Sequence, residues 1–298
     1  SNTERLYDQL VERFVKWAKT CSDIRAVVVV GSRVRVDHPA DEWADMDIIV
    51  ITADPERYLS TTDWLENFGN PLLTFLEQTA TGGEMERRVL FEGMLDVDFS
   101  IIPKRNAQHL LKDGITPQFS VQISNTFGRG MRVLLDKDGM TTQLQALITS
   151  IEKLTSRPPT QHEFLEVVND FLYHAVWTAK KLGRGELWTA KFCLDSYMKW
   201  RCILQMIEWY TRATKGWTYD TWFRGRFLEK WADPRVLEGL RGAFAHYDKE
   251  DIRRAMLATM DLFRWIAIET AEKLSYSYPT EADKDVTEWM KTCLSEDG

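Results

Sequence analysis

The sequence predicts an α+β protein in which an N-terminal domain built on a mixed β-sheet precedes a C-terminal helical bundle. In the first half, apolar residues gather in short β-branched runs, which are typical of buried strands. In the second half they recur at the spacing of a helix face. Pro158 and Pro159 lie between the halves and end any regular element. We therefore place one domain at residues 1–157 and another at residues 158–298.

Helical spacing at the N-terminus is followed by six predicted strands. An amphipathic helix is predicted over residues 6–18, and a buried strand over residues 26–30, where Gly31 ends it. Two further strands, at 87–92 and 94–102, meet near Gly93 and predict a hairpin. The remaining strands are predicted at 47–52, at 72–75 and, as an edge strand, at 131–136.

The second half predicts an antiparallel bundle. Thr160 and Glu163 have the spacing of a capping box, which predicts a helix start. We expect its buried face to hold Phe164, Val168, Phe171, Leu172, Ala175, Ala179 and Leu182. A second helix is predicted over 186–212, with Phe192, Met198, Ile203, Met206, Ile207 and Tyr210 inward. A third is predicted over 252–274, with Met256, Met260, Phe263, Ile266 and Ala267 inward.

Composition narrows the function classes. The 298 residues are 44% hydrophobic and 28% charged, as in soluble globular proteins. Apolar runs such as residues 26–30 are too short to cross a bilayer, and the N-terminus lacks a signal-peptide pattern, so we expect a cytoplasmic protein. A net charge of -7 disfavours nucleic acid and favours a cationic small molecule as partner. The four scattered cysteines have no zinc-ligand spacing and are expected to be free thiols.

Gly31 and Ser32 end the first buried strand and form a candidate phosphate site. A glycine lets the backbone turn sharply and approach a phosphate without a Cβ in the way. The following N–H groups and the Ser32 hydroxyl can then donate hydrogen bonds to phosphate oxygens. A glycine and a serine after a strand are common, so this feature alone indicates little.

Asp45 and Asp47 open the second strand and form a candidate metal site. Residues two apart in an extended segment point the same way, so both carboxylates face one side. Two like charges this close repel unless a cation lies between them, and Mg²⁺ prefers oxygen ligands and binds substrate phosphates. A solvated turn is the more common structure for such a pair, and only the combination with the preceding glycine and serine favours function.

Asp98 lies on a later apolar strand and is the predicted third carboxylate. If that strand pairs beside Asp47, the three carboxylates can hold metal ions that orient a triphosphate and activate a hydroxyl. Asp98 is either a metal ligand, the general base for that hydroxyl, or both. Asp96, on the same face, is the alternative base.

This arrangement resembles the polymerase-beta-type nucleotidyltransferases, and more closely the aminoglycoside 6-adenylyltransferases of the streptomycin type. The resemblance is carried by Gly31-Ser32-Arg33, by Asp45-Met46-Asp47-Ile48, and by residues 98–103. It continues through residues 169–180, 206–209 and 276–279, and so covers nearly the whole chain. It implies antibiotic resistance through transfer of AMP from ATP, with Mg²⁺, to an aminoglycoside hydroxyl. It also implies a nucleotidyltransferase domain followed by a helical substrate-binding domain.

Two other functions stay open: a nucleotidyltransferase acting on another small-molecule or protein hydroxyl, and a non-catalytic nucleotide-binding relative. The retained Asp45, Asp47 and Asp98 argue against the latter. The oligomeric state is expected to be a monomer or a weak dimer.

A polycationic acceptor needs carboxylates for its charges and flat side chains against its rings. Our acceptor candidates are Glu166, Asp170 and Trp177, although a solvated helix face is the more common explanation for such carboxylates and core packing for such a tryptophan. For the triphosphate, the candidates are Arg33 and Lys180, the latter lying where a cation also stabilises a helix C-terminus.

Overall fold

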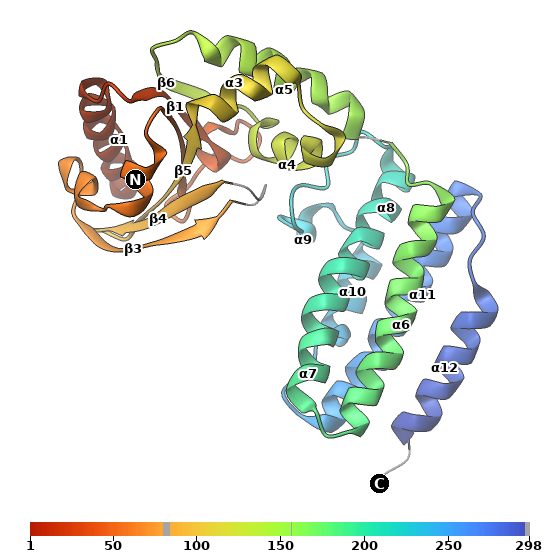
Figure 1. Cartoon of the computed structure of the whole chain (residues 1–298). Helices are drawn as coiled ribbons and strands as arrows, with labels where there is room; N and C mark the ends of the chain where they lie inside the picture. Colours follow the sequence, from red (N-terminus) through yellow and green to blue (C-terminus); the bar gives the residue numbers. More distant parts are fainter. Residues whose placement is uncertain (80–83, 156, 296–298) are drawn as a thin grey trace. The chain divides into compact units, whose positions relative to one another are not determined.

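The computed structural model describes residues 1–79, 84–155 and 157–295 (Figure 1). The chain divides into two compact units, Ser1–Thr155 and Ser156–Gly298, called unit 1 and unit 2 below. Unit 1 contains the β-sheet with its helices, so the predicted α+β class is confirmed. The assignment of nucleotidyl transfer to the first unit and substrate binding to the second stays a prediction.

The six predicted strands form one mixed sheet. Its order is β3-β4-β5-β2-β1-β6, so β3 and β6 are the edge strands. Strands β2 and β5 are parallel, whereas all other neighbours are antiparallel, including the predicted hairpin of β4 and β5. The bounds are β1 Ile24–Val30, β2 Met46–Thr52, β3 Pro71–Gln78, β4 Met85–Phe91, β5 Leu95–Pro103 and β6 Arg132–Asp136.

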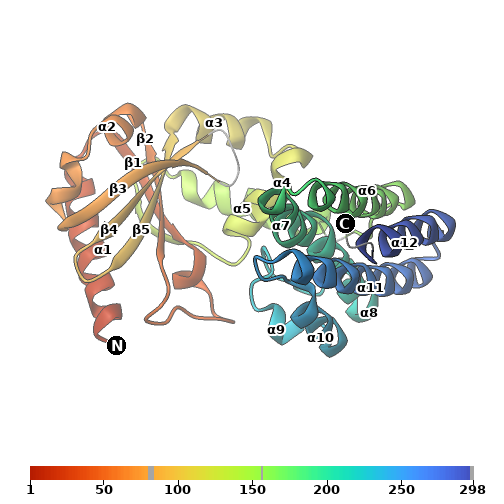
Figure 2. The same cartoon turned by 90° about the horizontal axis from the view of Figure 1, so that it is seen from below.

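Apolar residues alternate along the central strands of this sheet and are buried on both of its faces. Helices lie on both sides of the sheet (Figure 2). Val27 and Val29 point into the larger core, which α1 (Asn2–Thr20), α2 (Pro55–Ser60) and η2 (Asp63–Asn67) cover. Ala26, Val28 and Val30 point the other way, toward α3 (Lys104–Asp113) and α5 (Met140–Thr155). Helix α4 (Pro117–Phe127) completes the helices described for unit 1. This second face is where the candidate site lies, beyond the apolar residues that α3 and α5 cover.

Unit 2 consists of helices joined by loops, with no strand among its described residues. Its first helix begins at the predicted capping box, in which Thr160 and Glu163 each accept a hydrogen bond from the other's backbone N–H. The elements are α6 Gln161–Gly183, α7 Leu187–Phe192, a π-helix η3 Cys193–Ile203, α8 Leu204–Lys215, α9 Leu228–Trp231, α10 Pro234–Ala243, α11 Lys249–Leu274 and α12 Thr280–Ser295. The sequence pattern did not identify α9, α10 and α12, and it predicted one helix where the structure has α7, η3 and α8.

The predicted inward faces of the three bundle helices are buried, with one exception. Phe192 was predicted to point inward, and this is wrong, since 61% of its surface is exposed. The π-helix begins at the next residue and has a wider turn than an α-helix, which moves the buried face to Cys193 and Leu194. A 3.6-residue period does not anticipate such a shift.

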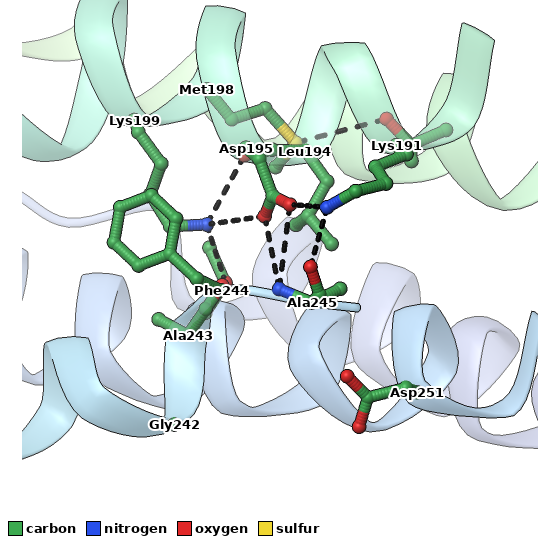
Figure 3. A network of polar contacts seen from close by, with 12 residues as sticks. Lys191, Leu194, Asp195, Met198, Lys199, Gly242, Ala243, Phe244, Ala245 and Asp251 are labelled. Atoms are coloured by element: carbon green, nitrogen blue, oxygen red, sulfur yellow. Dashed lines mark hydrogen bonds and ion pairs between the residues drawn. The ribbon is translucent and has the colours of Figure 1, made fainter. Parts of the chain in front are cut away.

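A partly buried polar network joins the π-helix to the turn between α10 and α11 (Figure 3). Asp195 accepts a hydrogen bond from the Ala245 N–H at 3.3 Å and pairs with Lys191 at 2.5 Å. Lys199 donates to the Leu194 carbonyl at 3.1 Å and to the Thr259 hydroxyl at 3.0 Å. Burial lowers the pKa of Lys199 to about 8, and the nearby Asp195 opposes that effect. The network fixes the turn that follows α10 against the bundle.

Two further sequence predictions concern the cysteines and the membrane. All four cysteines are free, and Cys21, Cys193 and Cys202 are buried. Among the residues that the structure describes, no helix combines the length and the apolar character that a bilayer span requires.

Candidate active site

The candidate site of unit 1 lies where β1, β2 and β5 meet. Asp47 and Asp98 are direct partners in the parallel register of β2 and β5, so their side chains leave the same face of the sheet. Asp45 precedes β2 by one residue. One carboxylate oxygen from each of Asp45, Asp47 and Asp98 lies within 4.8 Å of the others. The predicted proximity of the three carboxylates is therefore present, while metal binding itself stays a prediction.

Asp98 is the most buried of the three, with its side chain 8% exposed. Burial raises the pKa of Asp98 to about 7, and the negative charge of Asp47 adds to this, whereas Arg88 opposes it. Burial also raises the pKa of Asp96, which lies on the same face but outside the three-carboxylate cluster. Such a cluster of partly buried like charges favours a bound cation.

Two buried oxygen atoms at the site lack a hydrogen-bond partner among the described residues. They are the Ser32 hydroxyl oxygen and Oδ1 of Asp98. A buried oxygen without a partner is costly and needs an explanation. A phosphate oxygen would accept a hydrogen bond from Ser32, and a divalent cation would bind Oδ1 of Asp98. The residues present therefore fit Mg²⁺ and a nucleoside triphosphate.

Gly31 begins the short 3₁₀-helix η1 (Gly31–Val34) directly beside Asp47. Its φ is +77°, and a Cβ added there would lie 2.2 Å from Oδ2 of Asp47. Glycine is thus required twice, by the backbone conformation and by the close approach. The turn at Gly31 was predicted from the sequence, whereas its close approach to Asp47 became visible only with the register of β1 and β2.

Arg33 is already engaged within unit 1. Its guanidinium donates hydrogen bonds to the carbonyls of Ala44 at 2.7 Å and Asp45 at 3.0 Å, and it stacks on the Tyr7 ring with its Cζ 3.6 Å from the ring centre. Arg33 therefore holds the segment that carries Asp45. Its predicted contact with a triphosphate stays a prediction.

Arg88 and Tyr7 are site residues that the sequence analysis missed. Arg88 lies opposite Asp98 in the β4–β5 hairpin, and the two side chains form an ion pair at 3.6 Å. The signal was present, because a hairpin centred on Gly93 places residues 88 and 98 at equal distances from the turn. Tyr7 had no comparable signal, since it reaches the site from α1 and accepts a hydrogen bond from the Asp96 N–H at 2.9 Å.

The candidates predicted in the helical half all lie on α6 in unit 2. Glu166 is exposed and pairs with His162 at 3.6 Å, and Lys180 is exposed in the last turn with Trp289 nearby. Asp170 accepts hydrogen bonds from Tyr197 at 3.1 Å and lies 2.7 Å from His174. Their roles toward acceptor and triphosphate stay predictions.

Trp177, the remaining α6 candidate, is partly buried against the bundle core. Its ring contacts the ammonium group of Lys181 at 5.2 Å. Core packing thus accounts for part of its surface, and its predicted contact with the acceptor also stays a prediction.

Comparison with known proteins decides the family. The streptomycin adenylyltransferase family matches residues 4–293. This chain belongs to that family. The match confirms the resemblance seen in the sequence and places the chain among the nucleotidyltransferases.

Curated members of the family are similar to this chain over nearly their whole length. An aminoglycoside 6-adenylyltransferase of Bacillus subtilis (strain 168) is 24% identical over 295 residues, which are 96% of this chain and 97% of that protein. An enzyme of the same name from Staphylococcus aureus is 23% identical and covers 93% of this chain and 94% of its own. The crystal structure of a Bacillus subtilis aminoglycoside 6-adenyltransferase covers 96% of this chain and 98% of its own, with a TM-score of 0.45 and 20% identity.

Proposed function

We propose that this protein transfers AMP from ATP to a hydroxyl of a streptomycin-like aminoglycoside and releases pyrophosphate. The observation that carries the proposal is the cluster of Asp45, Asp47 and Asp98 beside the buried Ser32 hydroxyl, for which the described part of the chain offers no hydrogen-bond partner. The names of the curated relatives support the acceptor class. The net charge of -7 suits a cationic acceptor.

The site residues divide the reaction between them. Gly31 and Ser32 hold the triphosphate, and Asp45, Asp47 and Oδ1 of Asp98 would hold the Mg²⁺ that accompanies it. Mg²⁺ supplies charge neutralisation for the triphosphate and the leaving pyrophosphate. The acceptor oxygen forms a bond to the α-phosphorus while the bond between that phosphorus and the oxygen bridging to the β-phosphate breaks. Asp98 lies on the strand farther from Gly31, and we assign it the proton of the acceptor hydroxyl.

The test is pyrophosphate release from ATP and Mg²⁺ across a panel of aminoglycosides that includes streptomycin. We expect release that depends on one or more aminoglycosides and is lost in Asp47→Asn. Mass spectrometry of the product should show one added AMP. Release that occurs without any aminoglycoside, or equally with all hydroxyl compounds, would contradict the proposed acceptor. No release at all, despite ATP binding, would contradict the proposed activity.

A further inference from the structure

A row of side chains runs from the three-carboxylate cluster across the sheet to its edge. Asp47 is the register partner of Asp98, Asp98 of Arg88, and Arg88 of Phe75. Register partners point to the same face, so these four side chains follow one line over β2, β5, β4 and β3. On β3 this face is uncovered, because 52% of Phe75 and 54% of Leu73 are exposed.

The order of the strands sets the direction from which an acceptor arrives; this argument rests on the proposed function. Gly31 and Ser32 follow β1, on one side of the carboxylates of β2 and β5. In phosphoryl transfer the entering and leaving oxygens lie roughly in line, on opposite sides of the phosphorus. If the pyrophosphate leaves over β1, the acceptor hydroxyl enters over β5, and the rest of the acceptor lies over β4 and β3.

On that side, one cation is surrounded by three carboxylates. The Arg88 guanidinium lies 2.6 Å from Glu77, 3.0 Å from Glu86 and 3.6 Å from Asp98. The Glu86 side chain is only 13% exposed, whereas that of Glu77 is 52% exposed. Even without Asp98, which belongs to the three-carboxylate cluster, the two glutamates carry two negative charges against the one positive charge of Arg88 and leave an excess of negative charge. This environment favours an additional cation.

The exposed ring of Phe75 lies next to these charges. Phe75 pairs with Arg88 across the strands, and Glu77 is two residues further along the same face of β3. A solvent-exposed aromatic ring beside carboxylates is typical of sites that bind a cationic ring compound. The aromatic ring packs against the apolar face of the ligand and attracts the positive charge of the ligand.

We propose that this face of β3 and β4 is the acceptor subsite. Glu86 and Glu77 bind an ammonium or guanidinium group of the acceptor, and Phe75 packs against the ring that carries it. Arg88 keeps the two glutamates and Asp98 in place before the acceptor binds. When the acceptor arrives, the partly exposed Arg88 side chain gives up its ion pair with Glu77, and Glu77 then pairs with the acceptor cation. The acceptor hydroxyl then lies at Asp98, in the three-carboxylate cluster.

The test measures acceptor affinity apart from turnover. Titration calorimetry without ATP gives the Kd of streptomycin, or of the panel member with the fastest pyrophosphate release. We expect Glu86→Gln to raise this Kd and the acceptor KM about tenfold or more, and Phe75→Ala about threefold, with the KM for ATP and the Kd for Mg²⁺ unchanged. Glu92→Gln is the matched control, because Glu92 follows β4 and bonds Asn70 instead of Arg88.

Each outcome separates the subsite from the reaction. If Glu86→Gln does not fold, Glu77→Gln replaces it, since Glu77 is half exposed. Suppose that the wild type is active and that Phe75→Ala and the glutamate variant both keep its Kd and KM for the acceptor. That result overturns the subsite and leaves the proposed function intact. A wild-type protein that releases pyrophosphate from ATP but binds no aminoglycoside overturns both the subsite and the proposed function.

Discussion

Asp47 and Asp98 lie directly opposite each other in the parallel pairing of β2 and β5, the one parallel pair among the described strands. Each carboxylate leaves the same face of the sheet, and Asp45 brings a third into the same cluster. Their mutual repulsion works against folding in the absence of a cation, whereas it favours binding of one. Stability and metal affinity should therefore respond in opposite directions when one carboxylate is removed.

Asp98→Asn and Asp47→Asn test that opposition. We expect each to lower pyrophosphate release by about 10²- to 10⁴-fold and to weaken Mg²⁺ binding, because a ligand or base is lost. The Tm measured with a chelator should stay equal or rise, because a repelling charge is removed. Asp8→Asn, at an exposed position on α1, serves as control. A fall of several degrees in the chelated Tm would show that the carboxylates stabilise the fold instead.

Gly31→Ala tests the close approach to Asp47. A Cβ at 2.2 Å from Oδ2 must displace that carboxylate, so we expect weaker Mg²⁺ binding together with a loss of activity of about tenfold or more. Gly185→Ala is a matched control, because Gly185 has the same φ of +77° but open space around its Cβ position. Both variants should lose about 1–2 kcal/mol of stability through backbone strain. Equal activity in the two variants would contradict the proposed role of this contact.

The sequence predicted the local part of the site well, because that part follows from residue spacing. Gly31 and Ser32 end a β-branched run, and Asp45 and Asp47 open the next. The pairing of Asp98 with Asp47 was a conditional expectation, since spacing does not reveal which strands become neighbours. The hairpin around Gly93 did contain the position of Arg88 opposite Asp98. Tyr7, which arrives from a helix remote in sequence, required the packed structure.

The bundle illustrates a different limit. Its long helices were predictable because a continuous apolar face repeats with one period, as in α6 and α11. The π-helix from Cys193 changes that period within a helical run, and Phe192 consequently lies outside. Helices α10 and α12 are short or strongly charged, so few apolar residues mark their buried faces.

Asp195→Ala tests the network that joins the π-helix to the α10–α11 turn (Figure 3). The substitution leaves the Lys191 and Lys199 ammonium groups without their carboxylate and the Ala245 N–H without its acceptor. We expect a loss of about 3 kcal/mol in the free energy of unfolding, because the Lys199 charge is buried. Asp261→Ala removes an exposed ion pair with Arg264 and should change little. Similar denaturant midpoints for the two variants would contradict this account.

Glu208, on α8, is expected to make the stability of the bundle depend on pH. Burial raises the pKa of Glu208 to about 7, although Arg212 opposes that effect. The folded protein then holds this proton more tightly than the unfolded chain, whose pKa lies near the reference value of 4.5. Stability contributed by the protonated form is therefore complete below about pH 4.5 and is lost as the pH rises to about 7. At pH 8 the ionised carboxylate costs up to about 3 kcal/mol.

Glu208→Gln should remove this cost while keeping the size of the side chain. We expect the variant to be more stable than the wild type at pH 8, by up to about 3 kcal/mol, and nearly equal to it at pH 4.5. Denaturant titrations at the two pH values measure the difference, with Glu272→Gln at an exposed position of α11 as control. The same gain at both pH values would show that the substitution acts through packing. No gain at pH 8 would show that interactions within the folded protein offset the cost of burying the ionised carboxylate.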